Sequence, residues 1–386
     1  MEGVRVTDTT PIVVEAVRTP MAKEGGVFAD IRSEDLSLPL VNDILVSTSL
    51  TGEDVDDLMW GCAKQREEQG NNLARLIALL SDLGESVPAT TINRWDASSA
   101  QAIAGAADSI RAGQRDVIIA GGVENLTRAG FGTDKEYVPH RLGDTYLPGK
   151  LQRRETAENV AEEYGISREE QDQYAYRSHQ RAIEATDSGR FADEIVVMQT
   201  EDGRIEEDGS IRRDLSPDKL AQFPPVLQGN GTATAGNAPD LGDGAAATLI
   251  TSRTFAADHD LDVLAAIGSH TVAGVNPTMA GTGPISAVRG LLKRTGYTIE
   301  DYDLIELNEA FASQALHCQR ELGIDDERLN TNGGAIAIGH ALGACGARLA
   351  VTLVHEMKRR EVERGLVTMS VGFGQGMAIE LERKSA

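Results

Sequence analysis

The 386-residue sequence predicts an α/β fold in which buried strands alternate with helices. Short apolar runs predict buried strands, and longer Ala-rich stretches between them predict helices. The 40 glycines gather at the ends of the apolar runs, where tight strand–loop–helix turns require them. Such alternation is typical of sheets with mostly parallel strands. The longest apolar runs stay below the ~18 residues of a transmembrane helix, so we expect no membrane span.

The expected elements follow from these runs in chain order. Buried strands are expected at residues 12–14, 117–120, 246–250 and 366–369. Helices are expected at residues 97–112, 158–164, 168–187, 286–295 and 342–359.

The chain also contains an internal repeat. The run Glu-Asp-Val-Asp at 53–56 is echoed by Glu-Asp-Tyr-Asp at 300–303, and each copy follows a helix-like stretch and precedes a strand. Downstream, each half has a strand-like run, a turn, a long helix and another strand. These segments are 89–93, 97–112 and 116–121 in the first half, and 329–333, 342–359 and 365–371 in the second.

The repeat predicts a division into three parts. Residues 1–122 and 241–253 form the first half, and residues 254–386 form the second. The segment 123–240 has no counterpart and is rich in charge, Gly and Pro. We predict that it is an insertion that shapes a ligand site and contributes oligomer contacts.

Duplication would also bring together two equivalent turn-to-helix junctions, at Asp96 and His340. Helix N-termini carry unpaired N–H groups and the positive end of the helix dipole. Such a place stabilises developing negative charge, which suits chemistry that passes through oxyanions.

The charge balance excludes some classes of partner. The net charge is −23, with 60 acidic and 37 basic residues, of which only eight are lysines. Nucleic acids and anionic membranes require clustered Lys and Arg, so neither is expected. An acidic, Lys-poor surface suits solubility in concentrated salt, where the Debye length falls to a few Å. We therefore expect a halophilic source; the alternative is an ordinary acidic cytoplasmic enzyme.

Cysteine usage and the N-terminus indicate a cytoplasmic protein. The first ten residues lack the charged and apolar regions of a secretory signal. The three cysteines, Cys62, Cys318 and Cys345, are too few for a disulfide framework in so long a chain. Cys62 and Cys345 are expected to be small buried packing residues.

Many short motifs lie in one order along nearly the whole chain. They are VRTP at 17–20, WGC at 60–62, EQG at 68–70, NRW at 93–95, GGVE at 121–124, TAENVA at 156–161, SRE at 167–169, TAGN at 234–237, DGAA at 243–246, GP at 283–284, NEAFA at 308–312 and GGAIAIGH at 333–340. Together they resemble the thiolase superfamily, specifically its acyl-CoA C-acyltransferases.

The resemblance implies a five-layer α/β/α/β/α fold made of two duplicated halves and an inserted loop domain. It implies a CoA thioester as substrate, no further cofactor, no metal, and a homodimer or homotetramer. The resemblance to archaeal chains of this kind also implies a small OB-fold or Zn-ribbon partner. No Cys-x-x-Cys pattern occurs here, so such a partner would be a separate chain.

The resemblance also assigns catalytic roles. His340 would activate the nucleophile and bind the thioester oxygen, although Ala341 follows where relatives have Pro. Asn308 would hold a water for one oxyanion hole. The backbone N–H groups of Gly372 and of residue 96 would form a second hole. The alternatives are a capping or core histidine at 340 and a structural amide at 308.

The sequence departs from the family at both sulfur positions. The nucleophilic Cys falls at Asp96, and the second catalytic Cys falls at Ser370. A carboxylate is a weak nucleophile, and its acyl product would be a mixed anhydride that water destroys. Asp96 is therefore an N-cap, a residue with an altered catalytic role, or an introduced replacement of Cys. The Ser370 hydroxyl is expected to relay a proton or hold a water.

Two further positions bear on the nucleophile and the substrate. Ser98 or Ser99 would be the replacement nucleophile if a first-turn hydroxyl reaches the histidine, although both point to other helix faces than residue 96. Ala238, Pro239 and Phe311 are expected to contact substrate. Many relatives have a pantetheine-binding Ser where Pro239 stands, and Pro offers neither hydroxyl nor N–H.

The resemblance and the residues together predict an acyl-CoA C-acyltransferase acting on acetyl-CoA and 3-oxoacyl-CoA. One alternative is a decarboxylase or hydrolase of 3-oxoacyl thioesters that works without an acyl-enzyme. Another is an acyl-CoA-binding subunit of a hetero-oligomer.

Overall fold

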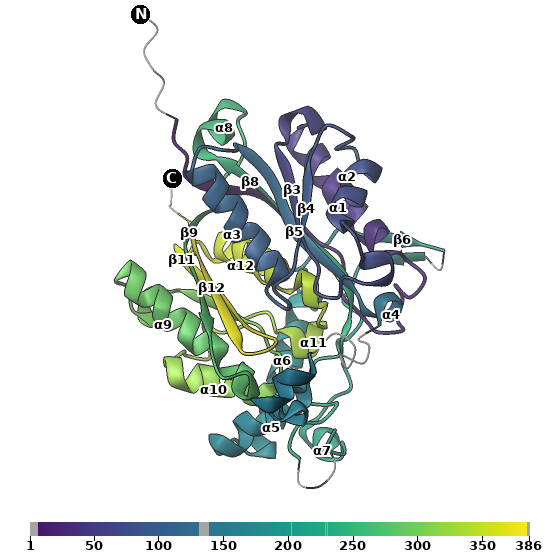
Figure 1. Ribbon diagram of the computed structural model, residues 1–386, viewed down its shortest axis with the longest axis vertical. Coiled ribbons are helices and arrows are strands. Elements are labelled where there is room, and N and C mark those ends of the chain that lie inside the picture. Colours follow the sequence, from purple (N-terminus) through teal and green to yellow (C-terminus); the bar gives the residue numbers. More distant parts are fainter. Residues whose placement is uncertain (1–6, 131–138, 202, 228, 230, 384–386) are drawn as a thin grey trace, which may run out of the picture.

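The computed structural model describes residues 7–130, 139–201, 203–227, 229 and 231–383 (Figure 1). Within this part of the chain, a ten-stranded sheet runs in the order β10-β11-β12-β9-β1-β8-β5-β3-β4, and β2 pairs with β8. Its strands are β1 (Pro11–Arg18), β2 (Ala22–Lys23), β3 (Asp57–Gly61), β4 (Ala89–Ile92), β5 (Val117–Asn125), β8 (Gly242–Ser252), β9 (Ala265–Gly274), β10 (Leu304–Leu307), β11 (Arg364–Val371) and β12 (Gln375–Glu382).

The sheet is mixed, so the expectation of mostly parallel strands was wrong. Parallel pairing is found for β3 with β4, β3 with β5, and β10 with β11. The pairs β1–β8, β5–β8, β1–β9, β9–β12 and β11–β12 are antiparallel. A three-residue turn joins β11 to β12, and such a short connection allows only an antiparallel return.

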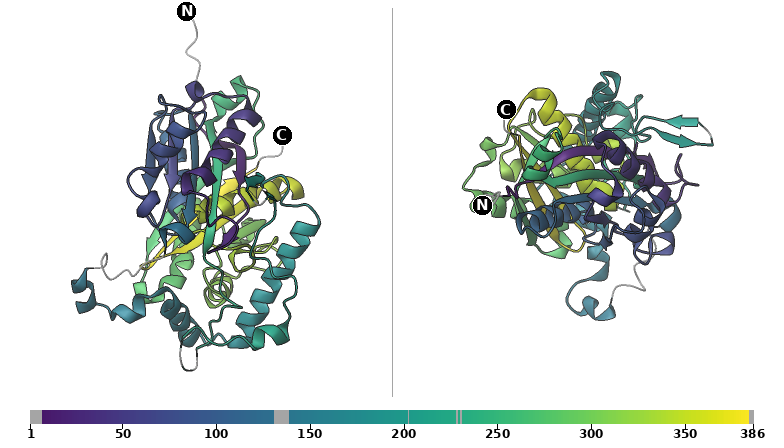
Figure 2. Two further views of the ribbon diagram at one scale, coloured as in Figure 1. Left: turned by 90° about the vertical axis from the view of Figure 1, so that its right-hand side faces the viewer. Right: turned by 90° about the horizontal axis from the view of Figure 1, so that it is seen from above.

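The helices and the two halves of the sheet form five layers, as expected. Three of the layers are helical, and the sheet lies between them. Helices α3 (Ser98–Arg111) and α12 (Cys345–Arg360) lie in the middle and share one apolar core with residues of β1, β5, β8, β9, β11 and β12. Helices α1 (Ser33–Thr48) and α2 (Leu73–Leu80) cover the outer face of the first half. Helices α9 (Gly283–Thr295) and α10 (Ala312–Leu322) cover the outer face of the second (Figures 1 and 2).

The remaining elements lie mostly in the segment between β5 and β8. They are α4 (Leu126–Ala129), α5 (Arg153–Glu163), α6 (Arg168–Asp187), the hairpin β6 (Met198–Thr200) and β7 (Gly203–Ile205), and α7 (Pro217–Ala221). The hairpin projects from the body of the molecule (Figure 2). Helices α8 (Arg253–Asp258) and α11 (Ala335–Ile338) complete the set. Strand β5 continues to Asn125, past the expected boundary at 122; the three-part division stays our proposal.

Local hydrogen bonds confirm the internal repeat. Thr51 and Asp54 form a capping box, and Thr298 and Asp301 form the same box in the second half. The next acidic residue of each copy, Asp56 or Asp303, accepts two backbone N–H bonds from the start of a neighbouring strand. Each copy therefore ties its short 3₁₀ turn to its own sheet.

The expected elements differ from the observed ones at several places. Helix α5 begins at Arg153 and α9 at Gly283, earlier than the starts expected at 158 and 286. The strand expected at 329–333 is reduced to isolated bridges, because Asn330 has φ 44° and the chain turns there. The helix expected at 342–359 begins with a 3₁₀ turn at Leu342–Ala344, and α12 starts at Cys345. Helix α6 matches its expected bounds, 168–187.

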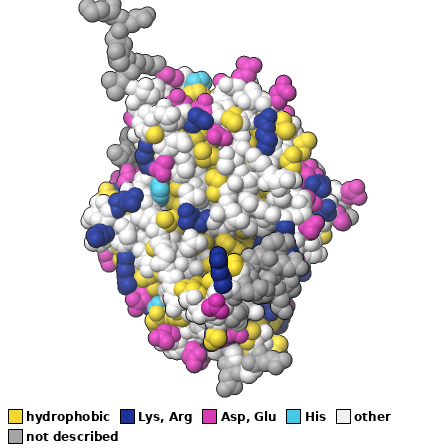
Figure 3. Space-filling model, viewed as in Figure 1, with side chains coloured by type: hydrophobic (Ala, Val, Ile, Leu, Met, Phe, Trp, Pro, Cys, Tyr) yellow, Lys and Arg dark blue, Asp and Glu magenta, His cyan; other side chains and the backbone are white. Residues whose placement is uncertain are grey.

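Acidic and basic side chains are interspersed over the face shown in Figure 3. No helix among the described residues is both long and apolar enough to span a bilayer. No group of three or more His, Cys, Asp or Glu side chains arranged to hold a metal ion is found in the described part of the chain.

Candidate active site

Three turns from distant parts of the chain meet at the carboxylate of Asp96. Asp96 lies between β4 and α3, and its Oδ1 is 2.9 Å from Nε2 of His340, which follows α11. Its Oδ2 accepts a bond of 3.3 Å from the N–H of Gly372, in the turn between β11 and β12. All three predicted residues are thus brought together, and both Asp96 and His340 are buried.

Asp96 does not cap the helix that follows it. The N-cap of α3 is Ala97, and within the described structure no side chain makes a capping hydrogen bond there. His340 lies five residues before α12, separated from it by the 3₁₀ turn, and so is not at a helix N-terminus. The expected pair of equivalent helix starts was therefore wrong in geometry, because the second half has α11 and an extra loop at this point.

Backbone strain marks two of the three turns that meet at the site, those that carry Asp96 and Gly372. Trp95 has φ 48° and Phe373 has φ 61°, a left-handed conformation that is uncommon for aromatic residues. The two rings meet edge to face with centroids 5.4 Å apart. A Cβ added to Gly372 would lie 3.3 Å from the Trp95 ring. The aromatic pair therefore holds the Gly372 N–H against Asp96, and strain of this kind clusters at functional sites.

The electrostatics favour an ionised Asp96 beside a neutral His340. Burial raises the pKa of Asp96, but the hydrogen bond from His340 and the charge of Arg153 lower it below its usual value. Burial lowers the pKa of His340, and Asp96 offsets this only in part. Since a carboxylate only accepts, the neutral imidazole donates its Nε2–H to Asp96.

Arg153 is a site residue that the sequence reasoning missed. It opens α5 in the inserted segment, and its Nη2 donates to the Ala310 carbonyl at 3.1 Å. Its guanidinium lies over the Phe311 ring, 4.6 Å from the centroid. Burial lowers the pKa of Arg153 to about 10, against the opposing influence of Asp96. The only signal in the sequence is its place just before the TAENVA motif.

Asn308 follows β10 and is fully buried, yet neither atom of its side-chain amide has a hydrogen-bond partner among the described residues. Its backbone N–H bonds the Thr368 carbonyl of β11 at 2.9 Å. Alternation along β10 places its side chain on the same face as Leu304, toward the middle helical layer. An unpaired buried amide costs about 1–3 kcal/mol, so this group is suited to a water or ligand.

Ser370 is less closely tied to the centre. It lies in β11 opposite Gly376, two residues before Gly372, and is buried. No hydrogen bond to its hydroxyl is found among the described residues. Alternation places its side chain on the face opposite Met369 and Val371, which belong to the middle core.

The expected substrate-contacting residues lie beside this centre. Phe311 and Ala238 pack in one small apolar cluster with residues of the inserted segment. Pro239 is buried, and the carbonyl of the next residue, Asp240, accepts the His340 backbone N–H at 3.0 Å. The loop that carries Pro239 therefore also fixes the position of His340.

Comparison with known proteins places the chain in a family. The domain families described as "Thiolase, N-terminal domain" and "Thiolase, C-terminal domain" match residues 11–254 and 261–383. A 3-ketoacyl-CoA thiolase of Pectobacterium carotovorum subsp. carotovorum is 44% identical over 383 residues, covering 96% of this chain and 99% of that protein. This chain belongs to the thiolase family.

Other similar proteins agree with this assignment. A beta-ketoadipyl-CoA thiolase of Acinetobacter baylyi is 41% identical over 395 residues, covering 96% of this chain and 98% of the relative. The crystal structure of the Bacillus anthracis acetyl-CoA acetyltransferase superposes with a TM-score of 0.90 at 35% identity, covering 97% of this chain and 99% of that one. The human mitochondrial 3-ketoacyl-CoA thiolase gives a TM-score of 0.89 at 35% identity, with the same coverage.

The two serines considered as replacement nucleophiles have local partners in this thiolase-family chain. Ser98 Oγ accepts the Arg94 N–H and donates to the Trp95 carbonyl, which closes the turn. Ser99 Oγ accepts the Ala347 N–H at 2.9 Å and so joins α3 to α12. Both hydroxyls are buried, and neither bonds His340 in the described structure. Their geometry favours structural roles.

Cys62 and Cys345 are buried free thiols, as expected of packing residues. Burial raises the pKa of both, to about 12 for Cys345, so neither is a thiolate at neutral pH.

Two buried glutamates hold the loops around the site. Glu124 accepts bonds from the N–H groups of Ala63, Lys64 and Gly343 and from the Gln69 amide. It thereby joins the end of β3 to the turn after His340. Glu309 accepts bonds from Tyr174, Ser178, Asn330 and the Ile336 N–H. It fixes the loop after Asn308 to α6 and α11.

A third buried glutamate predicts a pH dependence. Glu306 shares a strand face with Asn308, and burial raises its pKa to about 8 although Arg348 lies 3.3 Å away. Between pH 4.5 and 8 the folded chain holds a proton that the unfolded chain lacks, so stability falls as pH rises. The slope is at most about 1.4 kcal/mol per pH unit. In denaturant unfolding from pH 5 to 8, the free energy of unfolding should decline less steeply for Glu306→Gln than for wild type. Equal slopes would contradict this role of Glu306.

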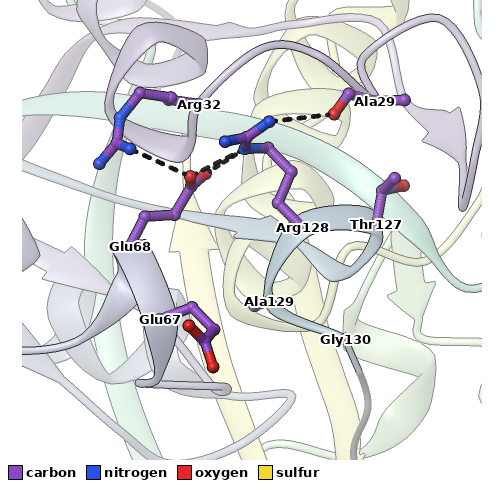
Figure 4. Close-up of a pocket in the computed structure, with 8 residues that line it drawn as sticks. All are labelled: Ala29, Arg32, Glu67, Glu68, Thr127, Arg128, Ala129 and Gly130. Atoms are coloured by element: carbon purple, nitrogen blue, oxygen red, sulfur yellow. Dashed lines mark hydrogen bonds and ion pairs between the residues drawn. The ribbon is translucent and has the colours of Figure 1, made fainter.

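A separate hollow of about 620 Å³ lies between the 3₁₀ turn at Glu67–Gln69 and α4. Figure 4 shows Glu68 in it, flanked by Arg32 and Arg128. None of the predicted site residues lines this hollow.

Proposed function

We propose that this chain is an acyl-CoA C-acyltransferase that exchanges acyl groups between CoA and 3-oxoacyl-CoA. Relatives named 3-ketoacyl-CoA thiolase and beta-ketoadipyl-CoA thiolase match it over nearly its full length, which supports this activity. The observation that carries the proposal is the junction of Asp96, His340 and Gly372. The buried Asn308 amide, which has no hydrogen-bond partner among the described residues, adds to this support.

The residues divide the proposed reaction between them. Cleavage of the C2–C3 bond leaves its electron pair on the acetyl thioester as an enolate, which then takes up a proton. A water held by the Asn308 amide, together with His340, would bind the enolate oxygen. Ser370, whose side chain lies on the other face of β11 from Asn308, would relay the proton to C2 through a water. Ala238, Pro239 and Phe311 would contact the thioester arm and acyl group.

Asp96 sets the route of the acyl group. Both carboxylate oxygens already accept bonds, one from His340 and one from the N–H that would stabilise an acyl oxyanion. This geometry disfavours a carboxylate attack that would give a mixed anhydride. It favours direct attack on C3 by CoA, whose thiol proton goes to the Asp96–His340 pair.

The same geometry supports a second candidate, hydrolysis. Water in place of CoA would convert a 3-oxoacyl-CoA into a carboxylic acid and acetyl-CoA, with its proton taken by the same pair. Incubation of the purified chain with 3-oxoacyl-CoA, with and without CoA, distinguishes the two. A new acyl-CoA formed only with CoA supports acyl transfer, and free acid formed without CoA supports hydrolysis. Binding without turnover would instead indicate the acyl-CoA-binding subunit.

Asn308→Ala tests the enolate site. We expect kcat to fall by about 10²- to 10³-fold with little change in KM, because the lost contact is made mainly in the transition state. Steady-state kinetics measure this. A parallel change confined to KM would contradict the assigned role.

The oligomeric state, partner chain, cofactor requirement and location are also proposals. We propose a homodimer or homotetramer, with a small OB-fold or Zn-ribbon partner as a separate chain, and no cofactor other than the CoA thioester. The net charge of −23 supports a salt-adapted protein. Its few cysteines fit a cytoplasmic location. Light scattering in molar KCl, with and without co-purified chains, tests the assembly.

A further inference from the structure

Arg153 brings a positive charge to the site and has no ion-pair partner among the residues that the structure describes. It is half-buried, and in the described part of the chain no carboxylate lies within 4.0 Å of its guanidinium. Within the described residues, its guanidinium makes one hydrogen bond, to the Ala310 carbonyl, and one of its faces lies on the Phe311 ring. Desolvated cations are costly unless an opposite charge compensates them.

Asp96 does not neutralise this charge by direct contact. Its Oδ1 is bonded to His340 and its Oδ2 to the Gly372 N–H, so both oxygens are directed at other donors. Asp96 raises the pKa of Arg153 by less than burial lowers it, so the net effect is a lowered pKa. Arg153 therefore keeps donor capacity for a second anion.

The geometry suits a carboxylate. Stacking on Phe311 and the bond to Ala310 fix the plane of the guanidinium, and its Nε and Nη1 have no hydrogen bond within the described structure. A fixed planar fork binds a carboxylate through two parallel hydrogen bonds. The phosphates of CoA are separated from the reacting thioester by the whole pantetheine arm. An anion near Asp96 is therefore more simply supplied by the acyl group.

We propose that Arg153 binds a carboxylate at the far end of the acyl chain, so that the substrates are 3-oxoacyl-CoA thioesters of dicarboxylic acids. This rests on the proposed function, because it assumes that an acyl group lies beside Asp96 and His340. A chain with net charge −23 repels such an anionic acyl group at long range. A local arginine would offset that repulsion and discriminate against neutral acyl chains.

The test compares 3-oxoadipyl-CoA with 3-oxohexanoyl-CoA, which differ only in a terminal carboxylate against a methyl group. We expect wild type to favour the adipyl thioester at least about tenfold in both affinity and kcat/KM. Arg153→Met should remove this preference while leaving hexanoyl binding within about threefold, and Arg153→Lys should keep part of it. Arg154→Met, which removes the same charge one residue away on an exposed side chain, should keep all of it.

Calorimetric binding separates this inference from the proposed function. Preferential binding of the adipyl thioester without turnover would overturn the function and keep the role of Arg153. Turnover of both thioesters without preference would overturn the role of Arg153 and keep the function. The N-acetylcysteamine thioesters of the same two acids lack phosphates. If Arg153→Met weakens both CoA thioesters equally and leaves both N-acetylcysteamine thioesters unchanged, Arg153 binds a CoA phosphate and the proposal is overturned.

Discussion

Asp96→Cys is expected to raise acyl transfer by on the order of 100-fold or more, the size usually associated with one catalytic group. A thiol at this position would lie beside Nε2 of His340, which now meets Oδ1 at 2.9 Å. Loss of the carboxylate also frees the Gly372 N–H, which now bonds Oδ2, to bind an acyl oxyanion. A thiolate beside an imidazole is a strong nucleophile, and a thioester is a competent acyl carrier.

The measurement is CoA-dependent cleavage of 3-oxoacyl-CoA, with intact-mass detection of an acyl adduct on the Asp96→Cys chain. Asp96→Asn is the matched control, because it keeps the size and loses the charge without gaining a thiol. It should form no adduct. An Asp96→Cys variant that folds, binds acyl-CoA and still shows neither adduct nor faster cleavage would contradict the mapping of the site.

Glu309→Gln is expected to destabilise the fold by about 3 kcal/mol, which is large against a total of about 5–15 kcal/mol. The Glu309 carboxylate accepts four hydrogen bonds at 2.8–3.1 Å from Tyr174, Ser178, Asn330 and Ile336. The Gln amide keeps only one acceptor oxygen. Its NH₂ group would face the hydrogen-bond donors that the second carboxylate oxygen now accepts. A Cβ on Gly334 would lie 2.3 Å from the same carboxyl carbon, so the surroundings leave little room for adjustment.

Chemical denaturation at fixed high salt measures this effect. Glu300→Gln makes the same chemical change on an exposed residue of the repeat and should alter stability by less than about 0.5 kcal/mol. If the two variants unfold at the same denaturant concentration, the buried carboxylate does not have the role assigned to it.

The sequence predicted the repeat and the central contact because both depend on local signals. The paired acidic runs that begin at Glu53 and Glu300 correspond to two identical capping boxes. The motifs at 93–95 and 333–340 indicated the contact of Asp96 with His340. The bounds of α6 also followed from the sequence, because a Ser167–Glu170 capping box fixes its start.

Other features depend on contacts that periodicity does not encode. Strand direction follows from the connections, so the antiparallel pairs of β8, β9 and β12 were missed. Asp96 has the local features of an N-cap, but tertiary contacts to His340 and Gly372 prevail over that preference. Arg153 reaches the centre from a segment without a counterpart in the repeat, so no symmetry pointed to it.

The position of β1 in the sheet determines how cooperatively the protein unfolds. One edge of β1 is bonded to β8, and its Ile12 and Val13 pair with Ala266 and Ala265 of β9. Neither half of the fold can unfold without exposing the apolar core that it shares with the other around α3 and α12. Calorimetry of the intact protein should therefore show one heat-absorption peak. For the same reason, a fragment ending near residue 260 should be insoluble when produced by itself.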